Sequence, residues 1–266
     1  IIINISDRGE GVMSFYNIYF SPTGGTKKIA EILAGGMMEP FVEVDMIKNP
    51  DALEQIRFTE NDLCFISVPS FGGRLPVVVA DKLKEIKGNG ARIVLVAVFG
   101  NRSIDDTLIE LQDILKDSGF CCLAGIEAVA EHSLIHQFGT GRPDQEDKAK
   151  LEEFSEKIKK CFGREAKAEE LELPGNHNYR EYHGVPLKPV TDRKCASCGL
   201  CAKECPTGAI SKANPQFTDK EKCISCMHCI AICPKHARHC NRLMSFIAAQ
   251  KMKKQCALRK ENKLYL

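Results

Sequence analysis

Cysteine spacing near the end of the chain constrains the structure more than any other feature. The pattern Cys-x2-Cys-x2-Cys-x3-Cys-Pro begins at Cys195 and recurs, displaced by 28 residues, at Cys223. The first three thiolates of each copy lie on a compact loop around one metal centre. The fourth opens a short helix that carries it away toward the other centre. The pattern predicts two iron–sulfur clusters in a pseudo-twofold unit.

Structural zinc is the competing interpretation of these thiols. Zinc sites also use Cys-x2-Cys pairs, and they need four ligands each. Zinc knuckles are paired, however, whereas both copies here are triplets that lead into Cys-Pro. The spacing therefore favours iron–sulfur clusters.

The duplicated pattern resembles two-cluster bacterial ferredoxins, including Cys-Pro in both copies and the run Thr207-Gly208-Ala209-Ile210 after the first. This resemblance implies a small α+β domain with two [4Fe–4S] clusters. It implies that one cluster is held by Cys195, Cys198, Cys201 and Cys233, and the other by Cys223, Cys226, Cys229 and Cys205.

Strand-like and helix-like segments alternate in the part of the chain that precedes these motifs. Apolar runs predict strands at residues 14–20, 41–47, 62–68, 91–99 and 120–130, and helical spacing predicts helices at residues 27–38, 77–86, 104–116 and 144–161. Such alternation predicts an α/β domain with a doubly wound, five-stranded parallel sheet. Ligands of such sheets bind beyond the carboxyl ends of the strands, where the strand order reverses.

The loop from Ser21 to Thr26 follows the first predicted strand and opens a helix. Its hydroxyl groups, its two glycines and the helix N-terminus suit a phosphate. A turn that only caps the helix is an equally good interpretation. The loop is neither a Walker A sequence nor G-x-G-x-x-G, which argues against nucleoside triphosphates and NAD.

Three loops together resemble those of flavodoxins, and the resemblance implies that FMN binds at the end of the sheet. The first contains Ser21, Thr23, Gly24, Gly25 and Thr26, the second Pro69, Ser70, Phe71, Gly72 and Gly73, and the third Phe99, Gly100, Asn101 and Arg102. The family implies a phosphate role for the first loop, a glycine peptide beside flavin N5 in the second, and contact with the ring in the third. Flavodoxins usually stack Trp or Tyr on the ring, whereas this chain has no Trp and offers Phe71 and Phe99.

The sequence makes weaker predictions for two other groups of residues. His132 and Ser133 follow the fifth predicted strand and can approach the same crevice, although a lone loop histidine is usually structural. Cys64, Cys121 and Cys122 lie in predicted strands, where free thiols behave as small apolar residues.

Charge divides the chain where the cysteine content changes. Residues 190–266 contain ten of the 14 cysteines and carry a formal charge of +10, whereas the residues before them carry −8. We expect an N-terminal extension at residues 1–12, a flavodoxin-like FMN domain at 13–165, a linker that packs over a surface at 166–189, a two-cluster domain at 190–240 and a basic helical tail at 241–266. The tail either docks an acidic redox partner or covers the cluster domain.

The whole arrangement resembles the flavodoxin–ferredoxin fusion proteins of anaerobic bacteria and archaea. That resemblance implies electron transfer between FMN and two [4Fe–4S] clusters in one soluble, low-potential carrier with protein redox partners. Two alternatives remain: an FMN-dependent reductase of a small acceptor such as a quinone or nitro compound, or an iron–sulfur sensor. Whether the protein is an enzyme is therefore open.

Location and further partners follow from what the sequence lacks. The apolar runs are strand-length, shorter than the roughly 20 residues of a membrane span, and no export signal is evident. The formal net charge of +2 argues against a dedicated nucleic-acid binder. We expect a cytoplasmic protein whose partners are redox proteins and not nucleic acid.

Overall fold

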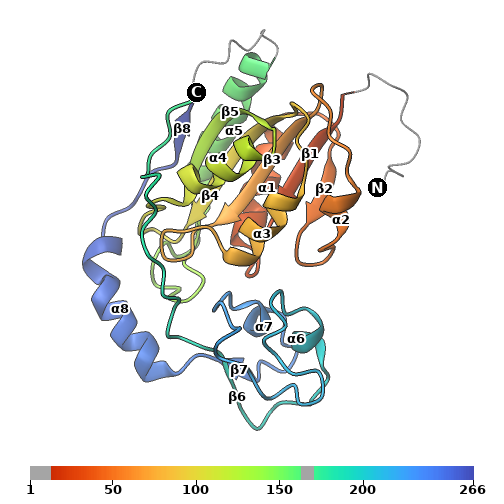
Figure 1. Ribbon diagram of the computed structural model, residues 1–266. Coiled ribbons are helices and arrows are strands. Elements are labelled where there is room, and N and C mark those ends of the chain that lie inside the picture. Colours follow the sequence, from red (N-terminus) through yellow and green to blue (C-terminus); the bar gives the residue numbers. More distant parts are fainter. Residues whose placement is uncertain (1–12, 163–170) are drawn as a thin grey trace.

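The structure is a computed structural model, and it describes residues 13–162 and 171–266. Figure 1 shows a larger α/β body, a smaller loop-rich body beside it, and a helix that runs from the smaller body back toward the sheet. The extension expected at residues 1–12 lies outside the described residues, as do residues 163–170.

The larger body contains strands that alternate with helices. The strands are β1 (Phe15–Tyr19), β2 (Val42–Asp45), β3 (Leu63–Pro69), β4 (Arg92–Phe99), β5 (Cys121–Val129) and, from the end of the chain, β8 (Lys263–Tyr265). The helices are α1 (Gly25–Gly36), α2 (Ala52–Gln55), α3 (Val77–Glu85), α4 (Thr107–Asp117) and α5 (Gln145–Phe162).

The sheet has the strand order β2-β1-β3-β4-β5-β8, and its first five strands are parallel. An order of 2-1-3-4-5 is the flavodoxin-like doubly wound topology, with its switch point between β1 and β3. The five predicted strands and four predicted helices are confirmed, with small shifts at their ends. The carboxyl ends of β1, β3 and β4 therefore place the three predicted loops at one edge of the sheet.

Apolar side chains cover both faces of the sheet. Ile29 of α1 and Phe154 of α5 belong to the core on one face, and Leu83 of α3 and Leu108 of α4 belong to the core on the other. Strands buried on both faces need continuous apolar runs, which is how β3 and β4 read in the sequence. Two helix layers thus hold the sheet rigidly beneath its loop edge.

The expected linker packs along the larger body from Leu171 onward, where the structure describes it again. Gln112 Nε2 donates a hydrogen bond of 2.9 Å to the carbonyl oxygen of Leu171, and the backbone N–H of Asn176 donates to Asp106 Oδ1 at 2.9 Å. Residues 171–180 therefore lie against α4 and the loop before it.

The smaller body is closed by a two-stranded pairing of β6 (Val190–Thr191) with β7 (Arg238–His239). It contains two short helices, α6 (Leu200–Lys203) and α7 (His228–Ala231). Positive φ angles occur at equivalent positions of the two cysteine motifs: 51° at Ser197 and 56° at Ser225, then 76° at Gly199 and 64° at Met227. The backbone therefore repeats along with the sequence.

The expectation of a helical tail is correct for α8 (Arg242–Cys256) and wrong for the rest of the tail. Residues after Cys256 are extended, and β8 pairs antiparallel with the outer edge of β5. Because β8 is only three residues long, its pairing depends on contacts made on either side of it. None of the helices in the described residues is long and apolar enough to cross a membrane.

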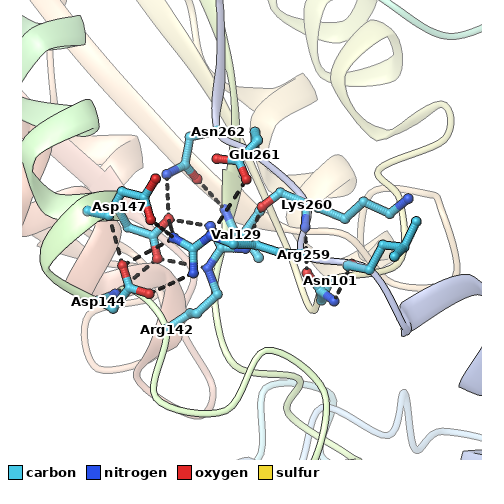
Figure 2. Close-up of polar contacts among 11 residues, drawn as sticks. Asn101, Val129, Arg142, Asp144, Asp147, Arg259, Lys260, Glu261 and Asn262 are labelled. Carbon is cyan, nitrogen blue, oxygen red and sulfur yellow. Dashed lines mark hydrogen bonds and ion pairs between the residues drawn. The ribbon is translucent and has the colours of Figure 1, made fainter.

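A polar cluster holds this extended segment to the sheet domain (Figure 2). Arg142 Nε donates to Asp147 Oδ2 at 2.8 Å, and both side chains are buried. Asn262 bridges the cluster to the sheet: its Oδ1 accepts the backbone N–H of Val129 at 2.8 Å, and its Nδ2 donates to Asp147 Oδ1 at 2.9 Å. Arg259 pairs with Asp144 at 2.7 Å. Arg259 of the predicted basic tail thus binds the sheet domain of its own chain.

Candidate cofactor sites

The second cysteine motif builds a thiol-lined cavity. Its wall includes Cys223, Cys226 and Cys229 together with Cys205, the fourth cysteine of the first motif. Three of these side chains come from one loop, and the fourth crosses over from the other copy. We call these four residues the inner thiol set.

Burial determines the protonation of two of the inner thiols. It raises the pKa of Cys226 and of Cys229 to about 12, so these thiols hold their protons at neutral pH unless a metal centre displaces them. In the described residues, no three His, Cys, Asp or Glu side chains are placed to hold one metal ion. All four inner thiols line one cavity, and four thiolates are the ligand number that a [4Fe–4S] cluster needs.

The remaining four cysteines, Cys195, Cys198, Cys201 and Cys233, form the outer thiol set. Cys233 Sγ accepts the N–H of Ala237 at 3.3 Å, and Cys195 Sγ accepts the N–H of Ser197 at 3.4 Å. Burial opposes ionisation of Cys233, but backbone N–H groups at Ala237, Lys235 and Arg238 bring its pKa below the ordinary value. Such donors also tune the potential of a bound cluster.

A cavity of about 340 Å³ lies at the edge of the sheet where the parallel strands end. The loops after β3, β4 and β5 form its floor, and its volume falls within the roughly 300–1,000 Å³ typical of small-molecule sites. Predicted flavin residues that line it are Ser70, Phe71, Gly72, Phe99, Gly100 and Arg102. Predicted residues that do not line it are Pro69, Gly73, Asn101 and the loop from Ser21 to Thr26.

Gly72 and Gly73 form a tight turn between Phe71 and Arg74, which are joined by backbone hydrogen bonds of 2.9 and 3.2 Å. Their φ angles are +62° and +88°. A Cβ on Gly72 would lie 2.5 Å from the ring of Tyr182. Glycine is therefore required at Gly72 both by the turn and by the segment that packs over it.

Asn101 has a different role from the one its position predicted. Its Nδ2 donates to the carbonyl oxygens of Cys256 and Leu258 at 2.8 and 3.0 Å, and its Oδ1 accepts the N–H of Lys260 at 3.0 Å. The buried side chain thus fixes the end of α8 to the loop after β4 (Figure 2).

The first loop lies at the same sheet edge, over the start of α1. Ser21 Oγ accepts the N–H of Lys27 at 2.8 Å, which is a capping contact. The first N–H groups of a helix have no intrahelical acceptor, so those of Gly25 and Thr26 remain for a ligand or water. Gly24 has φ +90°, which turns the chain into the helix. The loop therefore caps the helix and still leaves two backbone N–H groups directed outward from the helix start.

His132 belongs to the cavity, although a loop histidine gave little reason to expect it. Its Nδ1 accepts the N–H groups of Leu134 and Ile135 at 3.2 and 3.3 Å, so the ring hydrogen is on Nε2. Burial, with His136 and Arg102 nearby, lowers its pKa to about 4. The imidazole is a neutral hydrogen-bond donor in the cavity wall.

The rest of the cavity wall comes from segments far away in the sequence. Helix α8 contributes Met244, Ile247, Ala248 and Met252. These apolar side chains line the cavity together with Phe71 and Phe99, the two aromatic residues that the sequence offers for contact with the ring. The sequence did not reveal this, because α8 follows β4 by more than a hundred residues.

The second cysteine motif also reaches the cavity. Ile224 and Ser225, which lie between Cys223 and Cys226, line it directly. Ser225 Oγ donates to the carbonyl oxygen of Val185 at 3.1 Å, and Ile224 packs against the core of the sheet domain. The inner thiol set is thus separated from the cavity by one short loop.

Comparisons with known proteins agree with the smaller body's chemistry. Residues 190–238 match the 4Fe-4S dicluster domain family. The chain is 44% identical over 57 residues to a component of the ion-translocating oxidoreductase complex of Methanosarcina acetivorans, which covers 20% of this chain and 21% of that protein. It is 36% identical over 68 residues to trichloroethene reductive dehalogenase of Dehalococcoides mccartyi, covering 19% of this chain and 12% of that protein. The chain thus spans about a fifth or less of the length of these curated relatives.

Solved flavodoxins are similar to the larger body. A flavodoxin of Streptococcus pneumonia is 19% identical with a TM-score of 0.38, over 55% of this chain and 97% of that one. A flavodoxin from the domain Archaea is 10% identical with a TM-score of 0.41, and the match covers 57% of this chain and 100% of that one. By its own strand order the larger body is a flavodoxin-like sheet, and residues 190–238 are a 4Fe-4S ferredoxin-type domain. These parts support a role in electron transfer or as an oxidoreductase.

Proposed function

We propose that the protein transfers electrons between FMN in the sheet domain and two [4Fe–4S] clusters, and serves as a redox converter and carrier. A flavin exchanges electrons in pairs or singly, whereas each cluster exchanges one at a time. One observation carries the proposal. Ile224 and Ser225 form a wall of the cavity at the flavodoxin-like sheet edge, and the same loop carries two inner thiols.

The loops would hold FMN at two places on the sheet edge. The first turn of α1, with Ser21, Thr23, Gly24, Gly25 and Thr26, would take the phosphate. Phe71, Gly72, Phe99 and Arg102 would surround the ring in the cavity that they line. The neighbouring Pro69, Ser70, Gly73, Gly100 and Asn101 would shape those loops.

Helix α8 would exclude water from the ring. Its Met244, Ile247 and Met252 present thioether and aliphatic groups to the cavity. Apolar side chains of this kind would pack against the uncharged flavin ring and limit the access of water and small oxidants to it. We infer that this helix replaces the aromatic side chain that flavodoxins stack on the ring.

The junction between the bodies keeps the inner thiols close to the sheet. A small cavity there is lined by Phe20 and Met46 on one side and by Cys205 and Pro206 on the other. Lys188 Nζ also donates to the carbonyl oxygen of Cys223. These contacts would set the separation of the two cofactor sites within a single chain.

A reductase of small acceptors is the second candidate, and one observation favours it. His132 presents a neutral N–H to the cavity, where it would bind the oxygen of a quinone or nitro group as well as a flavin oxygen. Multiple-turnover assays with the reduced holoprotein separate the two candidates. A carrier reduces such acceptors slowly and without saturation, whereas a reductase shows a saturable rate.

The main experiment starts from anaerobic purification. We expect about eight irons and one FMN per chain. Stopped-flow reduction with a protein electron donor would then follow the cluster and flavin absorbance separately. The proposal requires flavin absorbance to fall after the clusters are reduced, with a rate that does not depend on protein concentration. A flavin that stays oxidised beside reduced clusters would exclude it.

A further inference from the structure

The two copies of the cysteine motif face different surroundings. In the second copy, Ser225, Met227 and His228 are buried at the junction with the sheet domain. In the first copy, Ala196, Ser197 and Cys198 are exposed. The sequence repeat therefore supplies one covered metal site and one that reaches the surface.

Basic residues surround the exposed copy. The pairing of β6 with β7 continues beyond the strands, because the N–H of Asp192 donates to the carbonyl oxygen of Ala237 at 2.9 Å. Arg193 and Lys194 directly follow Asp192, and Lys235 and His236 directly precede Ala237, so this hydrogen bond brings the two basic pairs to the same end of the pairing. We call these four exposed residues the basic rim.

The positive charges of the basic rim are not paired with any acidic side chain that the structure describes. Arg193, Lys194 and Lys235 form no ion pair with any residue in the described ranges. Like charges gathered at one end of the pairing repel one another, and a partner of opposite charge relieves that repulsion. By contrast, Arg259 in the C-terminal segment is paired with Asp144.

We propose that the basic rim is the docking surface for an acidic one-electron carrier protein, bound over the outer thiol set. The inference rests on the proposed electron-transfer function and adds the place and charge of the partner. The inner set is covered by the sheet domain, so the outer set is the one that a partner can approach. Complementary charge would steer that encounter and make it sensitive to salt.

A binding experiment with the anaerobically prepared holoprotein tests this directly. The probe is an acidic plant-type [2Fe–2S] ferredoxin, titrated by calorimetry at low and at raised salt. The test variant combines Arg193→Glu, Lys194→Glu and Lys235→Glu. The control combines Lys212→Glu, Lys253→Glu and Lys254→Glu, which are exposed residues away from the rim and change the net charge equally.

We expect the rim variant to bind the probe at least about tenfold more weakly, and the control less than about twofold. The loss should shrink as salt rises. Iron content and visible absorbance, unchanged in both variants, show that the clusters are intact. No binding by the wild type, equal losses in both variants, or a rim change that shifts only the cluster potential would overturn the proposal.

Nucleic acid is tested in the same series, since a basic surface also attracts phosphates. Binding of duplex DNA that exceeds binding of the ferredoxin and is lost with the rim would also overturn the proposal. Because calorimetry measures association only, its result is independent of FMN. Loss of docking with intact flavin reduction would leave the proposed function standing, and the reverse outcome would leave the docking surface standing.

Discussion

His228 Nδ1 donates a hydrogen bond of 2.8 Å to the carbonyl oxygen of Pro22, and so joins the second cysteine motif to the loop that opens α1. The other ring nitrogen lies 3.1 Å from Glu204 Oε2, next to Cys205. One buried imidazole therefore ties an inner thiol, through its neighbour, to the predicted phosphate loop. The first copy of the motif has Leu200 at the equivalent position.

Replacing His228 with leucine should loosen this junction. The carbonyl of Pro22 would lose its donor and Glu204 its contact with the ring nitrogen, at a cost of about 1–3 kcal/mol in unfolding free energy. Urea unfolding measures that loss, and stopped-flow flavin reduction should slow in parallel. Leu200→Gln, at the equivalent site of the exposed copy, is the control. Equal effects of the two changes on flavin reduction would contradict a special role for His228.

Asn101→Gly should release the C-terminal segment from the sheet. Glycine keeps the positive φ of 60° but removes three hydrogen bonds, worth about 3 kcal/mol together. Since α8 covers the cavity, flavin should dissociate faster, which fluorescence recovery measures. Asn89→Gly is the matched control, because Asn89 also has a positive φ, of 47°, and forms one side-chain bond far from the cavity. An unchanged rate of flavin release in the Asn101 variant would contradict the claim that α8 holds flavin in the cavity.

The stability of the protein should fall in mild acid because of His132. Its pKa is about 4 in the folded state and near 6.5 when unfolded. Between these values the unfolded chain takes up a proton that the folded one does not, so stability decreases as pH falls from 6.5 and levels off below about 4. At pH 5 this proton uptake lowers the free energy of unfolding by about 2 kcal/mol relative to neutral pH.

His132→Asn keeps an acceptor for the backbone N–H groups but cannot titrate in this range. The difference in unfolding free energy between wild type and variant should therefore shrink from pH 7 to pH 5. His183→Asn, which replaces an exposed histidine that does not contribute to the pKa of His132, should retain the wild-type slope. Parallel pH curves for the wild type and the His132 variant would show that His132 is not the titrating group.

The crossed ligand sets predict which cluster each fourth cysteine supports. Cys205→Ser should remove the covered cluster and Cys233→Ser the exposed one, each leaving about four irons per chain. Iron release to a chelator should be biphasic in the wild type, with the exposed site losing iron first. The slow phase should vanish in Cys205→Ser and the fast phase in Cys233→Ser. Loss of the fast phase in Cys205→Ser and of the slow phase in Cys233→Ser would contradict the assignment of the covered and exposed sites.

Much of the fold could be predicted because its information is local. Each of β1 to β5 is an apolar run, four of them are followed by helical spacing, and the two cysteine motifs need only their own spacing to be recognised. β8 could not be predicted, because three residues carry no periodicity and their partner strand β5 lies far back in the sequence. A strand of that length is defined by Asn262 and Arg259 on its flank, which look like ordinary surface residues in the sequence.

The candidate site shows the same division. Phe71, Gly72 and Phe99 were placed at the cavity by loop motifs, since the loops follow strands that end at one sheet edge. Asn101 sits in such a motif, yet its amide satisfies the backbone of residues 256–260. The apolar wall from α8 and the neutral state of His132 depend on burial by distant segments, which no local pattern encodes.

The position of β8 bears on how the chain is made. The strand that completes the edge of the sheet leaves the ribosome only after both cysteine motifs have emerged. The metal-binding body is thus an insertion between α5 and β8 in order of synthesis, although it looks like an appended domain. Iron delivery can therefore precede completion of the flavodoxin-like sheet, and a chain stopped before β8 would expose the edge of β5 to pairing with another molecule.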